Sequence, residues 1–255
     1  MKYAVMSDAH ANPDALERAL GDARRRGCTR FVFLGDVTGY GYDVKAALSL
    51  VRRNFSVVVM GNHDSACVGL EPSLEVLVNP NYDLDRDEGR TLDAEERRYL
   101  KSLPLTASEG GLLFAHGDFI EPGAWNYVFS TRDAALNFHF RGDGIMFCGH
   151  THHAAVWELT DKGMVRPRLE RRFSSPALRN ETSTIRIRAG SRYIVNVGSV
   201  GYPRNDRCAS YAIYDDEAKS ISMRRLSFDF KDYVAKMLDH GIRLPCWLFL
   251  PPAFA

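Results

Sequence analysis

The amino-acid sequence predicts an α/β fold that opens with three parallel strands. Short apolar segments alternate with amphipathic helical segments, and each apolar segment ends at a cluster of polar residues. The order is strand, helix, strand, helix, strand, and this alternation makes the three strands parallel neighbours in one sheet. The expected strands are residues 2–7, 30–34 and 56–60.

The first of the two intervening helices has visible boundaries in the sequence. Asn12 suits the N-cap, Pro13 suits the first helical position, and Gly27 closes the helix. The second helix is expected from about Asp43 to Arg53. The apolar residues of the first helix recur at helical spacing: Ala15, Leu16, Ala19, Leu20 and Ala23.

The middle of the chain is less regular. We expect an irregular excursion at about 65–104 that passes over the site and contains a helix at 92–103, capped by Thr91 or Asp93. A hairpin follows, and its turn is Gly110-Gly111. The other expected elements are the hairpin strands 105–108 and 112–115, a helix at about 133–140, strands 145–148, 155–159, 164–169, 184–188, 192–197, 210–214 and 220–226, a helix near 233–239, and an apolar tail at about 241–255.

The composition is that of an ordinary globular protein, with 45% hydrophobic and 25% charged residues. The formal net charge of +1 indicates no basic surface of the kind that coats a nucleic-acid duplex. No segment approaches the length of a membrane span or of a signal-peptide core. We therefore expect a single cytoplasmic domain over residues 1–255 without a membrane or nucleic-acid partner, and homo-oligomerisation stays open.

Polar clusters stand at the ends of five expected strands. In open α/β sheets the loops at the carboxyl ends of the strands converge and bind ligands. Five of the eight histidines of the chain fall in these clusters. Glycines precede three of the polar residues and are expected to permit tight turns there. The clusters are Asp8-Ala9-His10, Gly35-Asp36, Gly61-Asn62-His63-Asp64, His116-Gly117-Asp118 and Gly149-His150-Thr151-His152.

Each cluster alone could be an ordinary turn, because Asp, Asn and Gly are common in turns. Histidine-rich strand ends rarely serve packing, however, and here they recur in one chain. In combination, the imidazole and carboxylate side chains favour a metal site over five unrelated turns.

The series DAH, GD, GNHD, HGD and GHTH resembles the calcineurin-like metallophosphoesterase superfamily. The resemblance covers about residues 1–215 and implies a four-layer αββα sandwich of two mixed β-sheets flanked by helices. The segments SDAHAN, GDVTGYG and NVGSVGYPRN resemble the compact bacterial and archaeal YfcE-like phosphodiesterase branch. Protein phosphatases of the superfamily carry an arginine in the second motif, where this chain has Thr38-Gly39-Tyr40, which disfavours a phosphoprotein substrate.

The resemblance implies two adjacent metal ions and assigns the residues that hold them. Asp36 would bridge the ions with one carboxylate, which reduces the repulsion between two cations about 3.5–4 Å apart. Mixed imidazole and oxygen ligation suits Mn²⁺, Fe, Zn²⁺, Ni²⁺ or Co²⁺, and we expect manganese first. Asp8, His10 and His152 would hold the first ion, and Asn62, His116 and His150 the second.

His63 is the motif histidine without a metal in this assignment. The resemblance implies that it protonates the leaving alkoxide or stabilises charge at phosphorus, with Asp64 orienting its imidazole. Arg204, in a loop after the strand that ends near Val197, is a candidate contact for the substrate phosphate. Tyr40, Tyr42, Trp125 and Tyr127 either form an aromatic wall for a nucleoside or aryl group or belong to the local core.

The expected function is metal-dependent hydrolysis of phosphoesters, with a phosphodiesterase acting on a small or nucleotide-like substrate as the first hypothesis. A phosphomonoesterase or phosphoprotein phosphatase of the same fold is the alternative within the same chemistry. A scaffold that binds metal without catalysis is the alternative of another class. Retention of all seven ligands and of His63 favours the enzyme.

Overall fold

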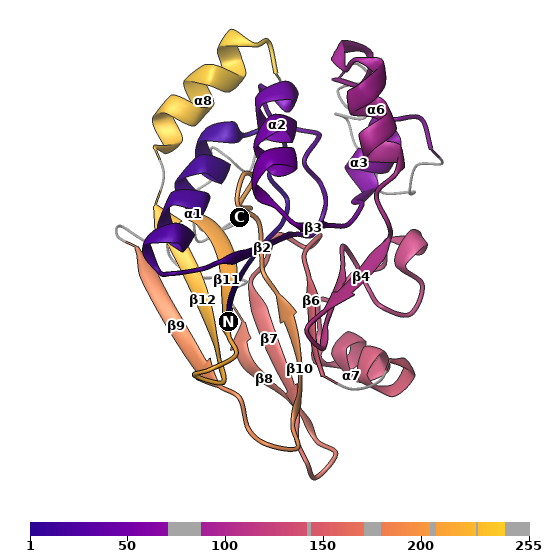
Figure 1. Ribbon diagram of the computed structural model, residues 1–255, viewed down its shortest axis with the longest axis vertical. Helices are drawn as coiled ribbons and strands as arrows, with labels where there is room; N and C mark the ends of the chain where they lie inside the picture. Colours follow the sequence, from indigo (N-terminus) through magenta and orange to yellow (C-terminus); the bar gives the residue numbers. More distant parts are fainter. Residues whose placement is uncertain (71–87, 142–143, 171–179, 205–207, 228, 243–255) are drawn as a thin grey trace.

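Two six-stranded sheets with helices on their outer faces form the framework of the protein (Figure 1). The computed structural model describes residues 1–70, 88–141, 144–170, 180–204, 208–227 and 229–242. The α/β sandwich of two mixed sheets expected from the sequence is confirmed. None of the helices in these ranges is long and apolar enough to cross a membrane.

The first sheet contains the three parallel strands that open the chain. β1 pairs in parallel with β2, and β2 with β3, as the alternating pattern predicts. β11 pairs antiparallel with β1 on its other side and makes the sheet mixed. The strand order is β3 (Val57–Val58), β2 (Arg30–Phe33), β1 (Lys2–Met6), β11 (Cys208–Asp215), β12 (Ser220–Ser227) and β9 (Glu181–Arg186).

The second sheet has its own set of three parallel strands. β5 pairs in parallel with β6, and β6 with β10, whereas β4, β7 and β8 are antiparallel to their neighbours. The order is β4 (Thr106–Glu109), β5 (Leu112–Ala115), β6 (Ile145–Cys148), β10 (Arg192–Asn196), β7 (Ala155–Leu159) and β8 (Val165–Glu170).

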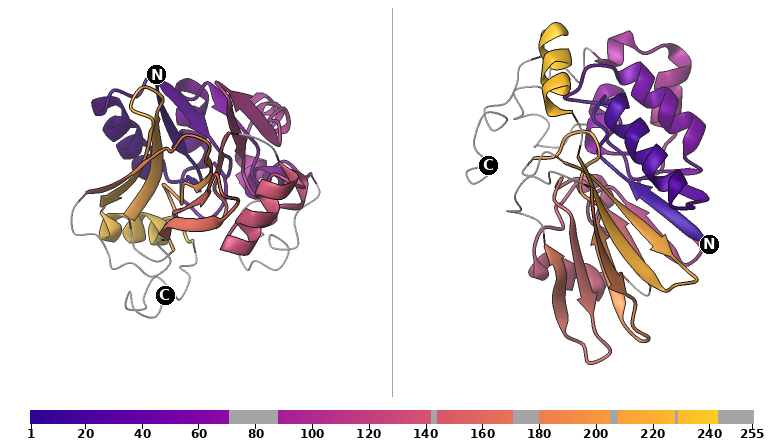
Figure 2. Two further views of the ribbon diagram at one scale, coloured as in Figure 1. Left: turned by 90° about the horizontal axis from the view of Figure 1, so that it is seen from below. Right: turned by 90° about the vertical axis from the view of Figure 1, so that its left-hand side faces the viewer.

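Alternating side chains give the sandwich three apolar layers. In β1, Ala4 and Met6 pack under α1 (Pro13–Arg25) and α2 (Val44–Asn54), while Tyr3 and Val5 face the second sheet. On the far side, the second sheet packs against α7 (Thr131–Phe140). Figure 2 shows α1 and α7 on opposite sides of the strands. The remaining helices are α3 (Asn62–Cys67), the short 3₁₀ helix η1 (Pro122–Ala124), α6 (Ala94–Lys101) and α8 (Phe230–Asp239).

The structure corrects two of the expected elements. β3 spans only Val57–Val58: the Val59 N–H still donates to the Phe33 carbonyl of β2 at 3.0 Å, but the Met60 N–H turns away and donates to the carbonyl of Pro104 at 2.8 Å. The Gly61-Asn62-His63-Asp64 cluster begins α3 rather than a loop. In the expected excursion, Asp93 caps α6, while residues 71–87 lie outside the described part of the chain. The same holds for residues 243–255 of the expected apolar tail.

Candidate metal centre

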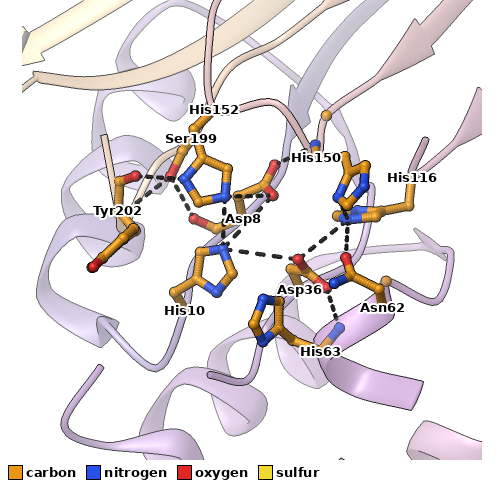
Figure 3. Close-up of polar contacts among 12 residues, drawn as sticks. Asp8, His10, Asp36, Asn62, His63, His116, His150, His152, Ser199 and Tyr202 are labelled. Carbon is orange, nitrogen blue, oxygen red and sulfur yellow. Dashed lines mark hydrogen bonds and ion pairs between the residues drawn. The ribbon is translucent and has the colours of Figure 1, made fainter. Parts of the chain in front are cut away.

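The polar clusters that follow the two sets of parallel strands lie together at the carboxyl ends of these strands (Figure 3). β1, β2 and β3 of the first sheet lead to the clusters at positions 8, 36 and 62, and β5 and β6 of the second lead to those at 116 and 150. Each of the seven residues that meet there exposes less than 10% of its surface. The residues brought together are Asp8, His10, Asp36, Asn62, His116, His150 and His152.

Each of the four histidines donates one ring N–H to a backbone carbonyl. A carbonyl can only accept a hydrogen bond, so the ring nitrogen that faces it carries the proton. In a neutral imidazole the other ring nitrogen then carries the lone pair that could bind a metal. The contacts are His10 Nδ1 to Thr38 O at 2.9 Å, His116 Nδ1 to Leu34 O at 2.7 Å, His152 Nδ1 to Tyr202 O at 2.7 Å, and His150 Nε2 to Trp125 O at 2.8 Å.

The ring nitrogens that do not face these carbonyls meet in two pairs. The Nε2 atoms of His10 and His152 are 3.0 Å apart, and Nε2 of His116 is 3.1 Å from Nδ1 of His150. Two lone pairs at hydrogen-bond distance repel each other unless a proton or a cation lies between them. The donor set therefore fits two metal positions, one at each pair.

Buried carboxylate oxygens complete both positions. Asp8 Oδ1 is 3.3 Å from Nε2 of His152, and Asp36 Oδ2 is 3.2 Å from Nε2 of His116. Neither oxygen has a hydrogen-bond partner, a costly state for a buried anion that a bound cation would relieve. Asp36 Oδ2 also lies 3.8 Å from Nε2 of His10, so this carboxylate stands between the two positions (Figure 3).

The grouping in space is the grouping that the sequence implied. Asp8, His10 and His152 offer ligand atoms within 4.8 Å of one another, and so do Asp36, His116 and His150. Asn62 joins the second group, since its Oδ1 is 3.1 Å from Nε2 of His116. Their service as metal ligands remains a prediction, which this geometry supports.

Burial prepares three of the imidazoles to act as neutral ligands. Desolvation is the main reason that the pKa values of His10, His150 and His152 lie well below 6.5. His116 behaves differently: burial opposes its charged form, but the adjacent Asp36 carboxylate outweighs this and raises its pKa to about 9. Without a metal, His116 thus holds a proton beside Asp36, which a cation at this position would displace.

Backbone strain is concentrated around the cluster. In the described part of the chain, eight of the nine non-glycine residues with positive φ border it, and each costs about 1–2 kcal/mol relative to ordinary backbone. Cross-strand contacts hold these turns, including the Asp8 N–H to Gly35 O and the His10 N–H to Asp36 O, both at 3.0 Å. The eight residues are Asp8, His10, Ala11, Asp36, Tyr40, Trp125, His150 and His152.

Two of the three motif glycines serve close approach rather than unusual backbone angles. A Cβ on Gly61 would lie 2.1 Å from Oδ1 of Asp36, and one on Gly149 would lie 2.6 Å from Oδ2 of Asp8. Gly35 combines both needs, with φ of +92° and a Cβ position 2.4 Å from the Gly61 nitrogen. The glycines therefore leave room for the carboxylates.

Asp64 fixes the backbone of the loops around the cluster, while its expected role in orienting the His63 imidazole remains a prediction. Its Oδ2 accepts hydrogen bonds from the N–H groups of Asp36 at 2.8 Å and Gly61 at 3.1 Å. Its Oδ1 accepts from the N–H groups of Val37 at 2.9 Å and Thr38 at 3.2 Å. Asp64 therefore holds the loop that carries Asp36 and joins it to the start of α3.

His63 borders both metal positions. Its backbone N–H donates to Oδ1 of Asp36 at 2.9 Å, and its ring meets the His10 ring edge to face at 5.1 Å. Its ring nitrogen lies within 4.8 Å of ligand atoms of His10 and Asp36, which belong to different groups. A proton donor for a leaving oxygen between the two positions would stand here.

The two predicted substrate contacts occupy different environments. Tyr40 is 6% exposed, stacks on Tyr202 at 4.5 Å and contacts the rings of His10 and His63, so it forms a buried wall. Arg204 is half-buried, stands two residues after the Tyr202 carbonyl that His152 contacts, and its charge helps burial to lower the pKa of His152. Contact of either residue with a substrate remains a prediction.

Sequence reasoning missed the residues that support the ligands. Ser199 Oγ donates to the Asp8 carbonyl at 2.8 Å and accepts the Tyr202 N–H at 2.8 Å, and Asn196 Nδ2 donates to the Gly149 carbonyl at 2.8 Å. Both residues belong to the segment Asn196-Val197-Gly198-Ser199, whose polar residues directly after the apolar strand β10 could have indicated this role. Of the four aromatic residues considered for a wall, Tyr42 lies apart and packs against Tyr233 of α8.

Comparison with known proteins agrees with this geometry. The chain is 30% identical to an uncharacterized protein of Methanocaldococcus jannaschii over 96% of this chain and 94% of that one. It is 31% identical to a metallophosphoesterase from Sphaerobacter thermophilus whose structure is solved, with a TM-score of 0.79 over 98% and 97% of the two chains. A hypothetical protein from Pyrococcus horikoshii OT3 shares the fold at 16% identity, with a TM-score of 0.67 over 95% and 94%.

The family model of the calcineurin-like phosphoesterase superfamily domain matches residues 1–219. This range contains every residue of the cluster, together with His63, Asp64 and Arg204. The superfamily membership indicated by the five motifs is thereby confirmed, and the chain belongs to the calcineurin-like phosphoesterase superfamily.

Proposed function

We propose that the protein hydrolyses phosphodiesters with two divalent metal ions and acts on a small or nucleotide-like substrate. One observation carries the proposal: two pairs of imidazole nitrogens face each other, one pair on either side of the Asp36 carboxylate. Such a pair of ions supplies an activated water and positive charge for the phosphoryl oxygens. Two divalent cations against the carboxylates of Asp8 and Asp36 leave a net positive charge, which suits an anionic substrate.

The residues around the cluster suit in-line displacement at phosphorus. His63 reaches the space between the two positions and is the candidate to protonate the leaving oxygen. Arg204 adds positive charge beside His152 and is the candidate contact for a phosphate oxygen. Asp64 holds Asp36 in the bridging position, which makes it a positioning residue rather than a catalytic one.

The test is hydrolysis of bis(4-nitrophenyl) phosphate by purified protein loaded with Mn²⁺. Wild-type protein is expected to turn over, Asp36→Asn to lose activity together with metal, and His63→Ala to keep metal and lose about 10²–10⁴-fold in rate. His139→Ala is the matched control, because His139 is an exposed histidine of α7 away from the cluster. Full activity of His63→Ala would refute the acid role.

The alternatives make different predictions in the same assay. Faster hydrolysis of 4-nitrophenyl phosphate than of the diester would identify a phosphomonoesterase, and release of phosphate from a phosphopeptide would identify a protein phosphatase. Bound Mn²⁺ without turnover of any of the three would indicate a metal-binding scaffold. The buried position of His63 among ligand atoms favours the enzyme.

A further inference from the structure

The cluster is buried, yet some of the residues that touch it reach the surface. Tyr127 stacks on the His150 ring with centroids 4.4 Å apart and remains 37% exposed. His153 follows the ligand His152 directly and is half-buried. Arg204 is likewise half-buried on the side of His152. A substrate that reaches the metal positions past these residues meets an aromatic ring near His150 and a guanidinium near His152.

Tyr127 belongs to a short aromatic strip. Phe129, two residues further along, is 36% exposed, and its ring contacts the His153 ring at 5.4 Å. Val128 between them is buried in the core with residues of α7, whereas Tyr127 and Phe129 are exposed and contact the neighbouring rings of His150 and His153. The strip therefore consists of Tyr127 and Phe129, presented together beside the cluster.

The strip is held in place before any substrate arrives. Val128 is 1% exposed, and the Phe129 N–H donates at 3.1 Å to the carboxylate of Asp133 at the start of α7. On the other side, the Asn126 carbonyl accepts the Asp118 N–H at 3.0 Å. With this backbone fixed and the rings seated against His150 and His153, the strip can bind a flat partner without a large loss of conformational freedom.

We propose that Tyr127 and Phe129 bind an aromatic group attached to the substrate phosphate, so that the enzyme selects aryl or nucleoside phosphoesters over alkyl ones. This inference rests on the proposed function and specifies its substrate class. Stacking of a base or aryl ring on an aromatic side chain contributes about 1–3 kcal/mol, which corresponds to a preference of roughly 5- to 150-fold. The strip replaces the wall of four aromatic residues that the sequence left open.

The test uses phosphonates, whose carbon–phosphorus bond this chemistry does not cleave, so that binding is read whether or not the protein is an active hydrolase. Phenylphosphonate, cyclohexylphosphonate and methylphosphonate are titrated calorimetrically into protein loaded with Mn²⁺. We expect wild-type protein to bind the phenyl compound about tenfold more tightly than the methyl compound, and more tightly than the cyclohexyl compound of similar size. Equal affinities for the phenyl and cyclohexyl compounds would overturn the proposal.

Substitutions assign the preference to the strip. Tyr127→Phe is expected to retain the preference for phenylphosphonate, and Tyr127→Leu and Phe129→Leu each to reduce it severalfold. Phe140→Leu is the matched control, because Phe140 is 62% exposed at the end of α7. If Tyr127→Leu weakened all three phosphonates equally, Tyr127 would act only as a support for His150, and the proposal would be wrong. Failure of bis(4-nitrophenyl) phosphate hydrolysis alone would refute the proposed function and leave these affinities to decide the selectivity.

Discussion

The Nε2 atoms of His10 and His152 lie 3.0 Å apart although each ring has already used its Nδ1–H on a carbonyl. Two neutral imidazoles in this arrangement oppose lone pair to lone pair, in a cluster where Oδ1 of Asp8 and Oδ2 of Asp36 also lack a hydrogen-bond donor. The folded protein has therefore assembled a cluster whose internal repulsion a bound cation would remove. Metal binding and stability should consequently be linked.

Metal loading is expected to raise the melting temperature. A ligand at a thousand times its Kd stabilises the native state by about 4 kcal/mol, which for a chain of this size corresponds to a shift on the order of 10 °C. Thermal unfolding in Mn²⁺ and in EDTA measures the difference. Asp36→Asn, which removes the carboxylate shared by both positions, should abolish it. A wild-type shift equal to that of Asp36→Asn would show that the ions bind elsewhere.

Asp64→Asn is expected to weaken metal binding without removing a ligand. Both carboxylate oxygens accept backbone N–H groups, and an amide would turn an NH₂ group toward one pair of these donors. Loss of a group that orients a ligand typically costs 10–100-fold in metal affinity, about the effect expected here. Competition with a metal-sensitive dye measures the Kd.

Asp118→Asn is the matched control for that experiment. Asp118 is also buried and belongs to the HGD motif, but its carboxylate accepts from the Glu121 N–H and from Asn126. Its substitution should leave the metal Kd within about twofold. An unchanged Kd for Asp64→Asn would contradict the positioning role.

Gly61→Ala is expected to displace the bridging carboxylate. The added methyl group would lie 2.1 Å from Oδ1 and 2.4 Å from the backbone nitrogen of Asp36, so the loop of Asp36 must move. Metal content after dialysis should fall below one ion per chain. Gly21→Ala in α1 is the control, since its methyl group meets only a side-chain tip at 3.4 Å and alanine favours the helix by about 1 kcal/mol.

The buried carboxylate of Glu158 makes stability depend on pH far from the metal centre. Burial alone would raise its pKa, but hydrogen bonds from Arg168, Ser191 and Arg166 outweigh burial and lower the pKa from 4.5 to about 2. Because the folded pKa lies below the unfolded one, the stabilisation is complete above pH about 4.5 and is lost as the pH falls toward about 2.

The free energy of unfolding of wild-type protein and of Glu158→Gln, measured in urea between pH 7 and pH 3, tests this linkage. The advantage of the wild-type protein should be largest at neutral pH and should shrink as the pH falls. A difference that stays constant over this range would mean that the charge of Glu158 does not stabilise the fold.

Sequence reasoning reached the residues of the buried cluster because each stands close to the end of an apolar strand, where local pattern and topology agree. It also located most strands to within a few residues. The backbone contacts of Asp64 escaped it, because three of the four N–H groups that donate to its carboxylate lie 26 to 28 residues away and meet it only after folding. Likewise, the groups that select the tautomers of His10 and His152 are the backbone carbonyls of Thr38 and Tyr202. Every residue has a carbonyl, so the sequence does not show which ones face a histidine.

The exposed aromatic strip escaped prediction for a similar reason. Tyr40, Tyr42 and Tyr127 are the same residue type, so the sequence does not distinguish their environments. The fold buries Tyr40 against His10 and packs Tyr42 against α8, and it leaves Tyr127 37% exposed beside His150. Burial is a property of tertiary packing, which residue type alone does not determine.

The most direct test of the two-metal centre is anomalous diffraction at the manganese absorption edge from crystals grown with Mn²⁺. The arrangement of the ligands predicts two peaks about 3.5–4 Å apart, on either side of the Asp36 carboxylate. One should lie against Asp8, His10 and His152, and the other against Asn62, His116 and His150. A single peak, or peaks away from these side chains, would contradict the account.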